Sequence, residues 1–235
     1  ADWIIDNTDN TVIGIDDFSG GYVENINKKV TFYKFNLTDL DKLHDVFIKE
    51  NIDIVYHFAA YAAEGLSPFI RKFNYENNII ASSNLITCSI EHDIKRFVFA
   101  SSSAVNGPRD LYGKDGVKPE DPLQPFNLYG YWKIAGEGMA QAYHQESGVP
   151  TVSLRLATTY GPGRDRGFTA AMTSALKAVA KGQRFEIPYR GKENYHFSHD
   201  VGAGFARAVI DSFSGYGVFN LLGQTRSVDE FLEII

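Results

Sequence analysis

The chain has 235 residues, a formal net charge of −6 and a hydrophobic fraction of 44%. These values are typical of a globular protein with one large domain or one domain and part of a second, and they exclude a general basic surface that would gather nucleic acid. The single cysteine, Cys88, excludes an internal disulfide, and no apolar run approaches the roughly 18 residues of a membrane span. We therefore predict a soluble, cytoplasmic protein without a nucleic-acid or membrane partner.

Short apolar runs and helix-periodic segments alternate along the first two thirds of the chain. Runs rich in Val, Ile and Phe predict strands, and apolar residues at a spacing of three and four predict helices. This alternation predicts an α/β fold with a doubly wound, parallel sheet covered by helices on both faces. The predicted strands are 11–16, 30–35, 53–58, 96–100 and 151–156, and the predicted helices are 40–50, 73–91 and 129–146.

The pattern changes after Leu156. We expect a loop over 158–163, a helix near 169–181 and shorter elements to the end of the chain. Ser227 and Glu230 have the spacing of a capping box, which predicts that a helix begins there. The change in pattern predicts two units, residues 1–157 and residues 158–235.

In parallel sheets ligands bind outside the carboxyl ends of the strands, so the residues there are the first candidates for chemistry. Asp16 ends one strand, where an acid can bind the adenosine ribose hydroxyls of a dinucleotide and repel a 2′-phosphate, although Asp-Asp before Gly-Gly also suits an ordinary turn. Phe58, Ala59 and Ala60 follow another strand, and the two alanines would let the backbone approach a ligand closely. The serines at 101–103 follow a third strand and could bind a substrate oxygen or satisfy backbone groups in a bend.

Tyr129 and Lys133 open a predicted helix with a spacing of four, so both lie on one face. An ammonium close to a phenol stabilises the phenolate, and we expect Lys133 to lower the pKa of Tyr129 from about 10 towards neutrality. Such a phenol can act as a general base towards an alcohol and as a general acid towards a carbonyl. One pair with this spacing also occurs by chance in a chain rich in Tyr and Lys.

Read together and in this order, these segments resemble the extended short-chain dehydrogenase/reductase family, and within it the nucleotide-sugar epimerases such as UDP-glucose 4-epimerase. The resemblance extends over nearly the whole chain. It is closest in 53–60, 75–78, 96–107, 125–137 and 155–163.

The resemblance implies a Rossmann-type dinucleotide-binding unit over 1–157, a substrate-binding unit over 158–235, NAD as cofactor, a nucleotide-sugar substrate and a homodimer paired through helices 73–91 and 129–146. Tyr129 would be the acid/base, Lys133 its partner and a ligand of the nicotinamide ribose, and Ser102 the hydrogen-bond partner of the reacting oxygen. The implied cofactor residues are Asp16, Phe58, Ala59, Ala60, Asn78 and Lys133.

The implied reaction is epimerisation through a transient keto-sugar. Dehydratases of this family carry an Asp-Glu pair directly after the active-site Ser or Thr, and this chain has Ser103 and Ala104 there. The alternative is an NAD-dependent dehydrogenase or ketoreductase with net oxidation. A non-catalytic module that senses a dinucleotide is a third reading, and the retained Tyr129 and Lys133 argue against it.

The sequence departs from the family pattern at several positions. Members begin with a strand and a glycine-rich turn that holds the cofactor pyrophosphate; Ala1 to Ile5 instead predict the end of a helix, so we expect a longer protein in which these elements precede the chain and in which the last helix continues. Thr158 stands where an Asn is frequent, and Glu193 stands where an Arg that binds the diphosphate is expected. Candidates to replace that Arg are Arg164, Arg166 and Arg190.

Overall fold

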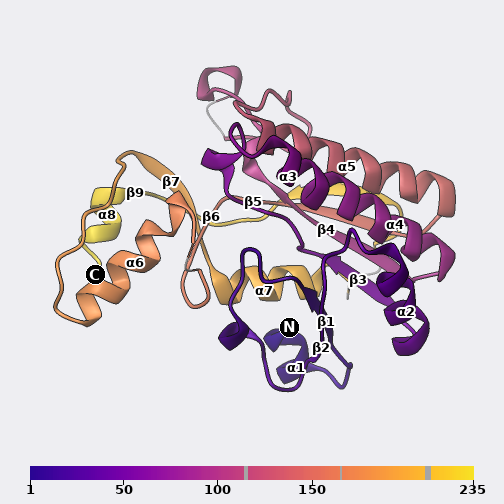
Figure 1. Cartoon of the computed structure of the whole chain (residues 1–235). Coiled ribbons are helices and arrows are strands. Elements are labelled where there is room, and N and C mark those ends of the chain that lie inside the picture. Colours follow the sequence, from indigo (N-terminus) through magenta and orange to yellow (C-terminus); the bar gives the residue numbers. More distant parts are fainter. Residues whose placement is uncertain (114–115, 165, 210–212) are drawn as a thin grey trace.

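Two of the strands whose carboxyl ends were predicted to carry site residues, 53–58 and 96–100, belong to the main sheet. The computed structural model describes residues 1–113, 116–164, 166–209 and 213–235. Its largest sheet has four parallel strands in the order β3-β4-β5-β8 (Figure 1). These are β3 (Ile54–His57), β4 (Arg96–Ser102), β5 (Thr151–Leu156) and β8 (Tyr216–Asn220).

Helices cover both faces of this sheet, as β4 shows. Because side chains alternate along a strand, Phe97 and Phe99 point to one face and Val98 and Ala100 to the other. The first face packs against α2 (Leu40–Glu50), α4 (Ala81–Glu91) and α5 (Leu128–Ser147), whereas the second packs on Phe205 of α7 (Ser198–Arg207). The predicted Rossmann-type α/β fold is therefore confirmed, and Cys88 is a buried core residue of α4.

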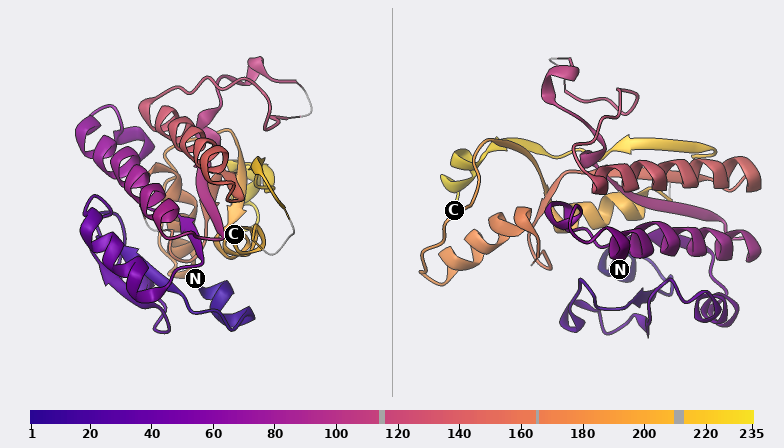
Figure 2. Two further views of the ribbon diagram at one scale, coloured as in Figure 1. Left: turned by 90° about the vertical axis from the view of Figure 1, so that its right-hand side faces the viewer. Right: turned by 45° about the horizontal axis from the view of Figure 1, so that its top comes forward.

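A second, two-stranded parallel sheet precedes the main one in the chain. It pairs β1 (Ile13–Asp16) with β2 (Thr31–Lys34), and the short helix α1 (Asp2–Asn7) before it packs against α7. Both strands were predicted, to within two residues at each end. Figure 2 shows this layer beside the main sheet and its helices.

The predicted helix over 73–91 is longer at its start and is interrupted within. The helix α3 (Arg71–Tyr75) runs through a π-helical turn over Glu76–Ile80 into α4. Single π-helical turns of this kind occur frequently at functional sites. Asn78, a predicted cofactor residue, lies in this turn. Short 3₁₀ turns occur at Val23–Asn25, Glu64–Leu66, Ser103–Val105, Arg109–Leu111 and Phe168–Ala170.

The last part of the chain builds a small sheet of its own in the order β6-β7-β9. The prediction of a loop over 158–163 was wrong at its start, because the β-branched and aromatic residues of β6 (Thr158–Tyr160) pair with β7 (Lys192–Phe197). Antiparallel to β7 lies β9 (Gln224–Ser227). The helices α6 (Ala171–Ala180) and α8 (Val228–Leu232) complete this layer, and the predicted capping box at Ser227 and Glu230 is present.

The described residues form three hydrophobic cores. Two lie on opposite faces of the main sheet, and the third joins Met172, Tyr195, Val228 and Phe231. Between the elements of this third core, the chain returns to the main sheet, where α7 packs and β8 pairs with β5. The predicted division of the chain between residues 157 and 158 stays a prediction. If units were instead defined by the core that each element packs into, α7 and β8 would belong to the first unit.

Candidate active site

The start of α5 is held close to the end of β4. The side chain of Asn127 caps the helix by accepting a 3.1 Å hydrogen bond from the N–H of Gly130. A Cβ atom on Gly130 would stand 2.2 Å from the carbonyl oxygen of Ala104, so only glycine allows this approach. Tyr129 is thereby fixed in the first turn of α5, beside the residues that follow β4.

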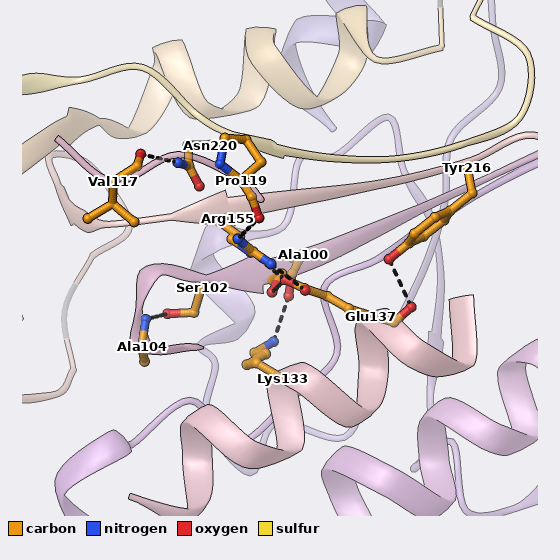
Figure 3. Close-up of polar contacts among 11 residues, drawn as sticks. Ala100, Ser102, Ala104, Val117, Pro119, Lys133, Glu137, Arg155, Tyr216 and Asn220 are labelled. Atoms are coloured by element: carbon orange, nitrogen blue, oxygen red, sulfur yellow. Dashed lines mark hydrogen bonds and ion pairs between the residues drawn. The ribbon is translucent and has the colours of Figure 1, made fainter. Parts of the chain in front are cut away.

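The three predicted catalytic residues come together there. Tyr129 and Lys133 lie one turn apart, with Lys133 Nζ 5.7 Å from the centre of the Tyr129 ring. Lys133 Nζ donates a 2.6 Å hydrogen bond to the carbonyl oxygen of Ala100 in β4. The Ser102 side chain is hydrogen-bonded to Tyr129. It also accepts a 3.1 Å bond from the N–H of Ala104 (Figure 3).

A small cavity opens beside this cluster, and five predicted residues line it: Ala59, Ala60, Asn78, Tyr129 and Lys133. They come from the end of β3, the π-helical turn and α5. Ser82, Phe99 and Trp132 line it as well. The structure therefore brings most of the predicted cofactor and catalytic residues to one place.

The charge state of the pair differs from the prediction. Burial raises the pKa of Tyr129 to about 12, and the hydrogen bond with Ser102 opposes this shift only in part. Lys133 is also buried, and burial lowers its pKa to about 8. The expected lowering of the Tyr129 pKa by Lys133 was wrong for the protein alone, because desolvation of the phenolate dominates.

Asn78 is hydrogen-bonded to the backbone of the loop after β3. Its Oδ1 atom accepts a 2.8 Å hydrogen bond from the N–H of Tyr61, and its Nδ2 atom donates to the Tyr61 carbonyl at 3.4 Å. This loop includes Ala59 and Ala60, so Asn78 sets the wall of the cavity. Its predicted contact with the cofactor stays a prediction.

Two other predicted cofactor residues lie outside this cavity. Asp16 ends β1, and its Oδ1 atom accepts a 2.6 Å hydrogen bond from the N–H of Phe18. Asp16 therefore stabilises the turn after β1, which was one of the two roles considered for it. The side chain of Phe58 is half exposed and packs against Phe205 of α7, with ring centres 4.5 Å apart and ring planes tilted by 50°. The structure does not bring Phe58 to Tyr129 and Lys133.

Among the candidate arginines, Arg164 lies nearest the chemistry. Its charge acts to lower the pKa of Tyr129, and its guanidinium donates a 2.9 Å bond to the hydroxyl of Thr169. Arg166 instead binds the Tyr22 hydroxyl at 2.9 Å, with its guanidinium carbon 4.5 Å from the centre of that ring. Arg190 is exposed.

Sequence reasoning missed several residues of the site. Trp132 lines the cavity and was not among the predicted site residues; its spacing of three from Tyr129 was the available signal. Its neighbour Tyr131 is 56% exposed. A buried ion pair between Glu137 and Arg155 was not anticipated either (Figure 3).

Three histidines, a residue type that often binds metals, differ in their exposure. His57 and His196 are buried, and His199 is exposed. Within the described part of the chain, no three His, Cys, Asp or Glu side chains gather as a metal site would require. Nor does any helix in that part have the length and apolar character to cross a bilayer.

A Rossmann-type sheet with a Tyr-x-x-x-Lys helix and a serine at the neighbouring strand end defines the class of the short-chain dehydrogenase/reductase proteins. The model of the "NAD dependent epimerase/dehydratase family" matches residues 4–220. The chain belongs to this family.

Curated relatives and solved structures agree with this assignment. The chain is 36% identical over 162 residues to the uncharacterised UDP-glucose epimerase YtcB of Bacillus subtilis (strain 168), covering 64% of this chain and 49% of the relative. It is 31% identical over 189 residues to a UDP-glucose 4-epimerase of Halalkalibacterium halodurans, covering 77% of this chain and 55% of the relative. The chain thus spans about half the length of these relatives.

Among solved structures, a UDP-glucose 4-epimerase of Thermotoga maritima with UDP-glucose superposes with a TM-score of 0.84 and 26% identity. The superposition covers 99% of this chain and 75% of that one.

Proposed function

We propose that the protein epimerises a nucleotide-activated sugar with NAD as its cofactor, in the manner of a UDP-glucose 4-epimerase. The observation that carries the proposal is the meeting of Tyr129, Lys133 and Ser102 at one end of the main sheet, beside a cavity lined by Ala59 and Ala60. Membership of the epimerase/dehydratase family and the named relatives support it.

The residues around the cavity fit the cofactor. Ala59 and Ala60 leave room for a flat ring, and Asn78 holds their loop in place. Asp16, at the end of β1, would bind the adenosine ribose and favour NAD over its phosphorylated form. When bound, NAD supplies a hydride acceptor and donor and a positive charge near the reacting sugar carbon.

Tyr129 would move the proton in this reaction. The positive charges of bound NAD and of Lys133 would favour its phenolate, whose oxygen would take the proton from the sugar hydroxyl and return it after the keto-sugar has turned in the site. Ser102, already hydrogen-bonded to Tyr129, would hold the same sugar oxygen. Lys133 would add its positive charge and bind the nicotinamide ribose.

Elimination of water is disfavoured at this site. Ser103 and Ala104 form the 3₁₀ turn directly after Ser102, and neither side chain has a carboxyl group that could serve as acid or base. Inversion of the oxidised carbon therefore fits these residues better than dehydration.

We further propose a cytoplasmic homodimer. The helices α4 and α5 lie side by side (Figures 1 and 2), and Phe73, Tyr75 and Tyr131 expose aromatic surface on this helical layer. Pairing of two copies through these helices would cover that surface. A chain with one cysteine, buried in α4, suits a reducing compartment. The substrate-binding unit would be built on residues 158–235.

The test uses the full-length natural protein with NAD and a panel of UDP-, dTDP-, GDP- and CDP-sugars in D₂O, followed by NMR of the sugar protons. We expect an epimer that carries no deuterium at the inverted carbon. Tyr129→Phe should slow its formation by roughly 10²- to 10⁴-fold, whereas Tyr131→Phe, at the exposed neighbouring position, should not. No epimer from any sugar, or steady accumulation of NADH, would contradict the proposal; NADH accumulation would favour the dehydrogenase alternative.

A further inference from the structure

A buried ion pair lies one turn beyond Lys133 and takes no part in the proposed chemistry. Glu137 and Arg155 are 5% and 4% exposed. Arg155 donates two hydrogen bonds of 2.8 Å, one to each carboxylate oxygen of Glu137 (Figure 3). Buried pairs are seldom more stabilising than apolar residues of the same volume, so stability alone does not account for this one.

The pair belongs to a set of contacts between α5 and β4. Tyr129, Lys133 and Glu137 follow one another at intervals of four residues and share one face of α5. Each contacts one of three consecutive residues of β4: Tyr129 meets Ser102, Lys133 meets the Ala100 carbonyl, and Glu137 accepts a 2.5 Å bond from the Ser101 hydroxyl. The contact of Glu137 therefore holds against β4 the same face of α5 that carries the other two.

Arg155 extends the set to the segment before α5. Its Nη1 atom donates a 2.9 Å bond to the carbonyl of Pro119. Close by, the side chain of Asn220 in β8 donates a 2.8 Å bond to the carbonyl of Val117 (Figure 3). Loss of Glu137 would therefore disturb both the helix that carries Tyr129 and the segment that leads to it.

Glu137 is also the negative charge that acts on Lys133. Burial lowers the pKa of Lys133, and the carboxylate of Glu137 opposes that shift. The other titratable groups close to Lys133 are Tyr129 on its own helix and His57 in β3, and the partner of Glu137 is Arg155 in β5. Tyr129 and His57 are uncharged at neutral pH, because burial raises the pKa of the first to about 12 and lowers that of the second to about 3. Arg155 is held by Glu137 itself.

We propose that Glu137 is a positioning residue of the active site, which fixes α5 against β4 and places a carboxylate one helical turn from Lys133. This inference rests on the proposed function for its link to catalysis, but the state of Lys133 is measurable without substrate.

The experiment follows the titration of Lys133 by NMR in protein labelled with ¹³C-lysine, with Lys133→Arg to assign the signal. Glu137→Gln keeps the shape of the side chain and removes its charge. Glu137→Gln combined with Arg155→Met avoids an unpaired buried guanidinium, so a folded variant without the carboxylate is obtained. Glu137→Asp retains the charge, and Glu146→Gln removes an exposed carboxylate from the same helix.

We expect the Lys133 midpoint to fall by about one pH unit or more in both variants that lack the Glu137 charge. It should stay near the parent value in Glu137→Asp and Glu146→Gln. The high-pH decline of kcat should move in the same direction, whereas KM changes little. A purely structural role would lower kcat equally at every pH.

A Lys133 midpoint that remains at the parent value in either folded variant without the carboxylate would overturn the inference. The absence of epimerase activity in the parent would instead overturn the proposed function, since the titration is measured without a sugar. The two failures are therefore distinguishable.

Discussion

Thr158 donates a 3.0 Å hydrogen bond to a carboxylate oxygen of Glu193, which joins β6 to β7. These are two of the positions at which the sequence departs from the pattern of nucleotide-sugar epimerases. The structure shows that the departures are partners: a buried hydroxyl meets the carboxylate that stands where an arginine was expected. Replacing either Thr158 or Glu193 would therefore leave the other without this hydrogen bond.

Thr158→Val should lower the free energy of unfolding by about 1–2 kcal/mol, because it removes the donor to a charged acceptor while keeping the shape of the side chain. Urea unfolding measures this change. Thr159→Val, at the next position of β6, is the matched control and should change stability less. Equal stability of Thr158→Val and the parent would show that the bond contributes nothing.

The glycines of α5 give a second prediction. A Cβ on Gly130 would meet the Ala104 carbonyl oxygen at 2.2 Å, and one on Gly136 would meet the Phe99 ring at 2.3 Å. Alanine at either position should therefore destabilise the protein by about 1–3 kcal/mol. At Gly138 a Cβ meets nothing within 4 Å, so Gly138→Ala should stabilise it by about 0.5–1 kcal/mol. Thermal unfolding of the three variants measures these changes in stability. A destabilised Gly138→Ala would contradict this account of the packing.

Much of this site could be predicted from sequence because its signals are local. The spacing of Tyr129 and Lys133 specifies one face of a helix, and the serines around Ser102 follow a strand directly. The parallel arrangement of the strands then brings their ends to one edge of the sheet. In the structure these residues meet as that reasoning expects, although their roles stay predictions.

What could not be predicted depends on contacts between distant parts of the chain. Nothing near Glu137 in the sequence indicates that Arg155 will face it across α5 and β5. The positions of α7 and β8 on the main sheet could not be predicted either, because they depend on contacts with strands that are distant in the sequence. The wrong sign for the Tyr129 pKa has the same origin, because the burial that dominates it is a property of the folded protein.

Lys133 should carry its charge at a cost to stability. The folded protein binds this proton less tightly than the unfolded chain, because burial lowers the pKa from 10.5 to about 8. The contribution of Lys133 to stability is therefore greatest above pH 10.5, falls as the pH falls to 8, and stays low below it. We expect Lys133→Met to raise the free energy of unfolding at pH 7 by about 1–2 kcal/mol while abolishing epimerisation.

Urea unfolding at several pH values tests this prediction for Lys133. The gain in Lys133→Met should shrink as the pH is raised from 8 towards 10.5, which separates the effect of charge from that of packing. A variant less stable than the parent at pH 7 would show that the bond from Lys133 to the Ala100 carbonyl outweighs the desolvation of the ammonium.

His57 should make the protein sensitive to acid. Its ring is buried, and Nε2 lies 2.7 Å from the hydroxyl of Ser82, which itself donates to the Asn78 carbonyl, so Nε2 carries the hydrogen. Burial and the charge of Lys133 lower the pKa of His57 from 6.5 to about 3. The unfolded chain therefore binds a proton that the folded protein excludes, and the stability due to this group, complete above pH 6.5, is lost as the pH falls towards 3. The loss should approach about 1.4 kcal/mol per pH unit within that window.

Urea unfolding across this range should show a shallower pH dependence for His57→Gln than for the parent, whereas His199→Gln, at an exposed position, should keep the parent slope. Identical slopes for His57→Gln and the parent would mean that the acid sensitivity arises from another group.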